Sequence, residues 1–302
     1  MFTAHDVLFG VLLPVVVPAV MLAIGWLITL RRSVAGAPSE LSPSAGELAR
    51  GDWIGPAAIG AGFAAGFVGV LGVPPFPAVD STDWFFALAI LLAVSGIIES
   101  LWRLPVWCRW INFLADAAIT IALLAWPLVR NSDNPMRVIG TLAALFVVLV
   151  ICWERLAAPG RDWPALETCC ATALVAMTLM MSGSKKLGQL AGMLAAALGP
   201  FVIACWCTRR IRVGSGTATV VMLLVFGLLL CGRYFANLTA TNGVLLWCGL
   251  VAAGARDRIP GIERLRPWQQ TVVGLVAVAV FSGTAAVIAA IEFARSMSEY
   301  GY

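Results

Sequence analysis

Long apolar runs dominate the chain, and short polar stretches separate them. The runs at 138–153 and 272–291, for example, contain no charged residue. A helix rises ~1.5 Å per residue, so runs of this length approach or match the ~30 Å hydrocarbon core of a membrane. Barrel strands would alternate polar and apolar residues, and these runs do not. The pattern therefore predicts an all-α, multi-pass integral membrane protein.

We expect about ten transmembrane helices in one polytopic helical bundle, with no soluble domain. The predicted spans are 7–30, 54–73, 84–101, 110–130, 137–156, 164–182, 187–207, 217–236, 240–255 and 268–293. Residues 31–53 are rich in Ser, Pro, Gly and Ala, which is typical of a flexible loop, here cytoplasmic. The span at 240–255 is short, and a re-entrant hairpin is the competing interpretation.

Basic residues lie at the ends of these runs, so they predict orientation rather than nucleic-acid binding, despite the net charge of +4. With the N-terminus outside, 14 of the 20 Lys and Arg fall on the cytoplasmic side, and both termini are outside. The chain has 18 Arg and only 2 Lys, which is typical of a GC-rich bacterial genome. We therefore expect a bacterial cytoplasmic (inner) membrane, with the lipid bilayer as the surrounding partner.

One acid lies deep inside a predicted span. Asn112, Asp116 and Thr120 are spaced four residues apart, so they share one face of the helix at 110–130. A lipid-facing carboxylate would cost ~2.5–3.5 kcal/mol, and this face should therefore meet protein or a water-filled cavity. Two interpretations stay open, namely a proton, cation or solute path and an interhelical hydrogen-bond clasp.

The remaining acids are expected near the membrane boundaries. Glu99 precedes Arg103 by four residues, which suits an ion pair on one helix face. Glu167 falls in the first turn of its span, where it complements the helix dipole. Glu154 and Glu292 also lie at span ends.

An outer polar patch is predicted between the spans at 217–236 and 240–255. We expect the Arg233 guanidinium to turn away from Asp116 and toward this stretch, where polar side chains cap orphan amides. The patch consists of Arg233, Asn237, Thr239 and Asn242.

Glycines at four-residue spacing predict close helix packing. Gly62 and Gly66 form one such pair, and Gly188 and Gly192 form another. We expect both helices to lie at the centre of the bundle.

No cofactor, metal or catalytic cluster is expected. The eight cysteines include no CxxC pair, and the only histidine is His5. No nucleophile–base pair or glycine-rich phosphate loop can be assembled, so the sequence does not favour an enzyme. A small-solute or ion-coupled transporter using the Asp116 face is the main hypothesis, and a non-catalytic subunit of a larger membrane complex, binding other membrane subunits or itself, is the alternative.

Overall fold

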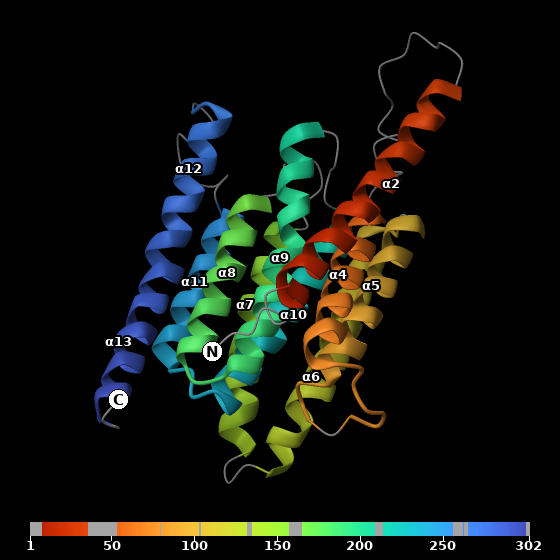
Figure 1. Ribbon diagram of the computed structural model, residues 1–302. Coiled ribbons are helices and arrows are strands. Elements are labelled where there is room, and N and C mark those ends of the chain that lie inside the picture. Colours follow the sequence, from red (N-terminus) through yellow and green to blue (C-terminus); the bar gives the residue numbers. More distant parts are fainter. Residues whose placement is uncertain are drawn as a thin grey trace.

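The residues that the structure describes fold into ten helical columns that run side by side as one bundle (Figure 1). The computed structural model describes residues 8–35, 53–78, 80–102, 104–131, 135–156, 165–208, 214–255, 262 and 265–299. All secondary structure in these residues is helical. The elements are η1 (Leu8–Leu12), α2 (Leu13–Ala35), α4 (Ile54–Leu71), α5 (Trp84–Trp102), α6 (Val106–Asn131), α7 (Pro135–Leu156), α8 (Ala165–Met181), α9 (Lys185–Thr208), α10 (Ser215–Phe235), α11 (Ala240–Ala255), α12 (Pro267–Val278), η5 (Ala279–Gly283) and α13 (Thr284–Glu299).

Each of the ten predicted spans is a helix, and most boundaries differ from the prediction by only a few residues. Six helices in the part of the chain that the structure describes are long and apolar enough to cross a membrane. Crossing by the other four stays a prediction. The stretch at 240–255 is one unbroken helix, α11, which a re-entrant hairpin would not be. The linker at 36–52 lies outside the described residues.

The centre of the bundle is α10, where 94% of the residues in its most apolar 18-residue stretch are buried, compared with 33% in the corresponding stretch of α6. A helix that is apolar on every side belongs in such a position, and the other helices surround it. At one edge, α12, η5 and α13 form a single long column (Figure 1). The N-terminus of α12 is capped by Gln269, whose side chain accepts a hydrogen bond from the Arg266 amide, 2.9 Å away.

Glycines of α4 pack directly on prolines of α2. An added Cβ would lie 2.4 Å from Pro18 Cγ at Gly62 and 2.4 Å from Pro14 Cγ at Gly66. Both pairs are spaced four residues apart, so two glycines on one helix face receive two prolines from the facing helix. The close contact expected at Gly62 and Gly66 is present.

The second glycine pair behaves differently from the prediction. A Cβ at Gly188 would collide with Met180, in the neighbouring helix α8. At Gly192, however, no heavy atom of the described residues lies within 4 Å of an added Cβ, so this part of the structure shows no close helix contact there. The four-residue spacing places Gly188 and Gly192 on one face of α9, but it does not determine the distance from each glycine to the neighbouring helix.

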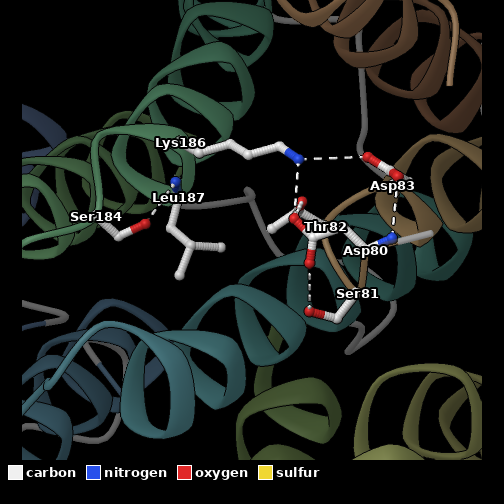
Figure 2. A network of polar contacts seen from close by, with 7 residues as sticks. All are labelled: Asp80, Ser81, Thr82, Asp83, Ser184, Lys186 and Leu187. Carbon is white, nitrogen blue, oxygen red and sulfur yellow. Dashed lines mark hydrogen bonds and ion pairs between the residues drawn. The ribbon is translucent and has the colours of Figure 1, made fainter. Parts of the chain in front are cut away.

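One end of the bundle is joined by an ion-pair cluster (Figure 2). The Lys186 ammonium at the start of α9 lies 3.1 Å from Asp80 and 3.3 Å from Asp83, both in the α4–α5 loop. Thr82 also donates a hydrogen bond to Asp80, at 2.9 Å. The α4–α5 loop and the α8–α9 turn therefore lie at the same end of the bundle. The predicted topology also places these two connections on one side.

Candidate functional site

Two consecutive helices each present a pair of polar residues at the same depth. Ser95 and Glu99 are four residues apart on α5, and Asn112 and Asp116 are four residues apart on α6. Ser95 lies seven residues before the end of α5, and Asn112 six residues after the start of α6. Because only three residues connect these antiparallel helices, the two polar faces meet.

Hydrogen bonds join these four side chains into one group. Ser95 Oγ donates to Asp116 Oδ2 at 2.6 Å, and Asn112 Nδ2 donates to Ser95 Oγ at 2.8 Å. The same Asn112 amide makes a long, weak contact with Glu99 Oε2, at 3.5 Å. Asp116 and Glu99 are only 4% and 2% exposed. The structure thus holds two buried carboxylates in one polar network.

The third helix of the network is the central one. Ser215, the first residue of α10, donates a short hydrogen bond to Glu99 Oε1. Arg109 interacts electrostatically with Glu99, although its Nε donates to the Leu104 carbonyl at 2.9 Å. Among the residues described, neither Glu99 nor Asp116 forms an ion pair. We refer to Ser95, Glu99, Asn112, Asp116 and Ser215 as the carboxylate network.

Close backbone contact places Ser215 beside Glu99. A Cβ added to Gly216 would lie 2.6 Å from the Gly96 carbonyl oxygen, and one added to Gly96 would lie 3.0 Å from the Gly216 carbonyl oxygen. Only two glycines allow α5 and α10 to approach this closely. Each glycine directly follows a residue of the network, so the helix contact sets the network's geometry.

Aromatic rings cover the network on the α7 side. Trp153 stacks on Phe113 with ring centroids 4.4 Å apart, and Trp110 meets Trp153 edge-on at 4.7 Å. The Trp153 indole donates to Thr219 Oγ1 at 2.8 Å, and Thr219 in turn donates to the Ser215 carbonyl at 3.1 Å. Trp153 is therefore buried and ties α7 to α10.

The polar face predicted on α6 points into the protein, and its three members do different things. Asn112 and Asp116 join the network. Thr120 is fully buried, but its hydroxyl donates to the Asp116 backbone carbonyl at 2.8 Å and not to the carboxylate. The Thr120 hydroxyl is therefore satisfied within α6 and does not hold the acid.

Glu99 lies near the end of α5, as expected, but its side chain is buried inside the protein and not at an interface. Its expected partner, Arg103, lies outside the described residues, and the Glu99 side chain is buried against Ser215 and Asn112. A signal for this was present in the sequence. Ser95 and Glu99 repeat the four-residue spacing of Asn112 and Asp116 on the adjacent helix, at matching distances from the loop.

Glu167 is likewise buried inside the bundle although it lies at a helix end. It occupies the first turn of α8, as expected, yet it is 1% exposed. An added Cβ on Gly274 of α12 would lie 2.9 Å from Glu167 Oε1, so the acid packs on the backbone of that helix. Glu154 is exposed near the end of α7, whereas Glu292 is exposed in the middle of α13 and not at a helix end as expected.

The outer patch divides into exposed and buried parts. Arg233 is exposed and donates to the Leu238 carbonyl at 3.0 Å, so its guanidinium turns toward this stretch as expected. Asn237 is exposed with a left-handed φ of 52°, and Thr239 Oγ1 accepts from the Asn242 amide at 3.3 Å. The Asn242 side chain is fully buried, and within the described part of the chain neither its oxygen nor its nitrogen has a hydrogen-bond partner.

The chemistry available at the carboxylate network is proton exchange between two acids held by hydroxyl and amide groups. In the described residues, no three His, Cys, Asp or Glu side chains are placed to hold a metal ion. Six described cysteines are free thiols. Comparison with protein-family models, with curated proteins and with solved structures found no match.

Proposed function

We propose that this chain is a proton-coupled transporter of a small solute, with Asp116 and Glu99 as the acids that carry the coupling proton. The observation that carries this proposal is two carboxylates, each at most 4% exposed, joined by Ser95 and Asn112 and without an ion pair in the described residues. Ionisable groups at such depth are costly and mark ion or proton paths in membrane proteins.

The donor groups favour a proton over a metal cation. A bound Na⁺ would need oxygen atoms with free lone pairs facing it. Here Ser95 directs its proton at Asp116, and Ser215 directs its proton at Glu99. Both carboxylates therefore already accept hydrogen bonds, an arrangement that suits gain and loss of a proton on the acids themselves.

The position of the two acids gives the proton a route. Glu99 lies three residues from the end of α5, ~4–5 Å along the helix, whereas Asp116 is ten residues into α6, ~15 Å from its start. Glu99 is the acid nearer the membrane boundary, and Asp116 is near mid-depth. Asn112 and Ser95 bridge them, so protonation of one acid changes the charge that the other experiences.

The network also connects the proton to helix movement. An ionised Asp116 accepts a charge-assisted hydrogen bond from Ser95, and a protonated acid gives up much of that strength. The affected contacts join α5, α6 and the central helix α10. Protonation therefore weakens the contact between α5 and α6 and favours a different packing around α10.

Orientation and location extend the proposal. The excess of Arg on one side supports a bacterial cytoplasmic membrane with both termini outside, which would place Glu99 near the cytoplasmic boundary. In a cysteine-free background, Ser81→Cys should react with a membrane-impermeant thiol reagent in intact cells, and Ser44→Cys should not. The reverse labelling would invert the direction of proton entry.

Proton flux in liposomes tests the function. Protein is reconstituted into liposomes that contain a pH-sensitive dye, an inside-negative potential is set with valinomycin, and sugars, polyols, amides and amino acids are added outside in turn. We expect at least one class to speed internal acidification in wild type but not in Asp116→Asn or Glu99→Gln. Glu154→Gln changes an exposed acid and should match wild type.

Two results would contradict the proposal. If Asp116→Asn acidifies as fast as wild type, the acid is a clasp and not a coupling group. If no solute class raises the rate above that of protein-free liposomes, the chain is not a transporter of this kind, and the non-catalytic subunit of a membrane complex becomes the better hypothesis.

A further inference from the structure

One amide and one hydroxyl without partners in the described residues lie in a different part of the bundle from Asp116 and Glu99. Asn242 and Ser282 are fully buried, and the Asn242 oxygen and nitrogen and the Ser282 oxygen have no hydrogen-bond partner among the described residues. A buried amide or hydroxyl is nearly always paired, because leaving it unpaired costs ~1–3 kcal/mol. Such groups in a folded protein call for a ligand or another explanation.

These groups follow one line along α11. Asn242 and Gly249 are seven residues apart, two helical turns, and so share a face. A Cβ on Gly249 would lie 1.9 Å from Ser282 Oγ, which means that the hydroxyl of η5 rests on this glycine. Asn242 and Ser282 therefore face the same interface, ~10 Å apart along the helix.

The line continues along the neighbouring column. Eight residues separate Gly274 from Ser282, and the π-turn of η5 holds one residue more than an α-turn. Gly274 and Ser282 therefore lie on the same face of the column, as two residues seven apart would in a regular α-helix. Gly274 is the position on which Glu167 packs, ~12 Å from the level of Ser282.

Together these positions span most of the membrane's thickness. The α11 seam, as we name it, consists of Asn242, Gly249, Ser282, Gly274 and Glu167. It covers ~22 Å of a ~30 Å hydrocarbon core, with an amide at one end, a hydroxyl in the middle and a carboxyl group at the other. At Ser282 and Glu167 the polar group faces a glycine, where no side chain separates it from the opposite backbone.

We propose that the α11 seam is the solute-binding path, and that its solutes are small, uncharged molecules carrying both hydrogen-bond donors and acceptors. The unpaired Asn242 amide offers one of each, and the Ser282 hydroxyl also offers both. A charged solute would need an opposite charge, and none lies at the levels of Asn242 and Ser282 among the seam residues. This inference rests on the proposed transporter function, and it separates the solute site from the proton site.

Exchange of labelled solute tests the seam without using the proton. Labelled glycerol and labelled urea are the probes, measured across proteoliposome membranes at equal pH and zero voltage. Wild type should exchange at least one of them faster than protein-free liposomes. Asn242→Leu and Ser282→Ala should each lower that exchange about tenfold, the loss expected from roughly one hydrogen bond to the solute.

Two controls separate a binding role from a structural one. Thr241→Leu makes the same kind of change at an exposed neighbouring position, and its exchange should equal that of wild type. The melting temperature of Asn242→Leu should stay unchanged or rise, because an unpaired amide contributes nothing to the fold.

The seam proposal fails if wild type exchanges neither probe faster than protein-free liposomes. It also fails if Asn242→Leu lowers the melting temperature, since the amide would then be holding the fold. In either case acidification that depends on Asp116 and is driven by another solute would leave the proton-coupled function standing. If glycerol or urea exchange is intact but acidification does not depend on Asp116, the seam proposal stands and the proton-coupled function fails.

Discussion

Two polar regions lie inside the bundle, and they differ in whether their polar side chains have hydrogen-bond partners. In the carboxylate network, Ser95 donates to Asp116 and accepts from Asn112, and Glu99 accepts from Ser215. In the α11 seam, Ser282 has no partner in the described residues. The contrast teaches that burial alone does not define a role: a paired acid is suited to hold a proton, and an unpaired amide or hydroxyl is suited to receive a solute.

Glycine contacts should give the largest difference between the two regions. Gly216→Ala would push a methyl group against the Gly96 backbone, which cannot rotate away, and we expect unfolding to become easier by ~1–3 kcal/mol. At Gly249 the obstacle is the Ser282 hydroxyl, which can turn to another rotamer, so Gly249→Ala should cost less. Thermal unfolding of the detergent-solubilised protein measures both.

Gly192→Ala is the matched control, because no atom of the described residues lies within 4 Å of its added Cβ. The substitution should raise stability by ~0.5–1 kcal/mol through helix propensity alone. Equal losses at all three glycines would show that the contact between α5 and α10 has no special importance.

Removing a serine hydroxyl should give an intermediate effect in one region and none in the other. Ser95→Ala leaves Asp116 without its donor and Asn112 without an acceptor, which should cost ~1–3 kcal/mol. Ser282→Ala removes a hydroxyl that is unpaired and should be neutral or stabilising. The denaturation midpoints of the two variants are compared with that of wild type under one condition. Equal losses of stability in both variants would contradict the difference between the two regions.

The ion-pair cluster provides the smallest expected effect, as an exposed reference. Lys186→Met should cost only ~0.2–1 kcal/mol, because Lys186 and Asp80 face solvent, and added salt should reduce the difference from wild type. Stability curves at low and high salt measure this. A loss larger than that of Ser95→Ala would mean that the loop cluster, and not the buried network, holds the helices.

The same cluster has a defined pH dependence. Burial raises the pKa of Asp80, but hydrogen bonds from Thr82 and Lys186 and the Lys186 charge together bring that pKa below its usual value. A carboxylate whose pKa is lower in the folded protein stabilises the fold above the unfolded-state pKa, and this contribution disappears as the pH falls through the folded-state pKa. Asp80→Asn should remove this part of the acid sensitivity, and an unchanged acid limb would contradict the pairing.

The helices could be predicted well because a long apolar run by itself indicates a helix that is removed from water. The network was predicted only in part. Asp116 is conspicuous within an apolar run, whereas Glu99, near a helix end, resembles an ordinary boundary acid until the facing helix is considered. Packing distance at Gly192 and the missing partners of Asn242 depend on which helices become neighbours, and no local pattern encodes that.

An infrared pH titration tests the central claim most directly, because it needs no known solute. The C=O stretch of protonated carboxyl groups is recorded for the reconstituted wild type, Asp116→Asn and Glu99→Gln over a range of pH. We predict a pH-dependent band in wild type that Asp116→Asn lacks and whose midpoint moves in Glu99→Gln, because the two acids interact electrostatically. Spectra that change identically with pH in all three proteins would show that neither buried acid exchanges a proton, and would contradict the proton-coupled function.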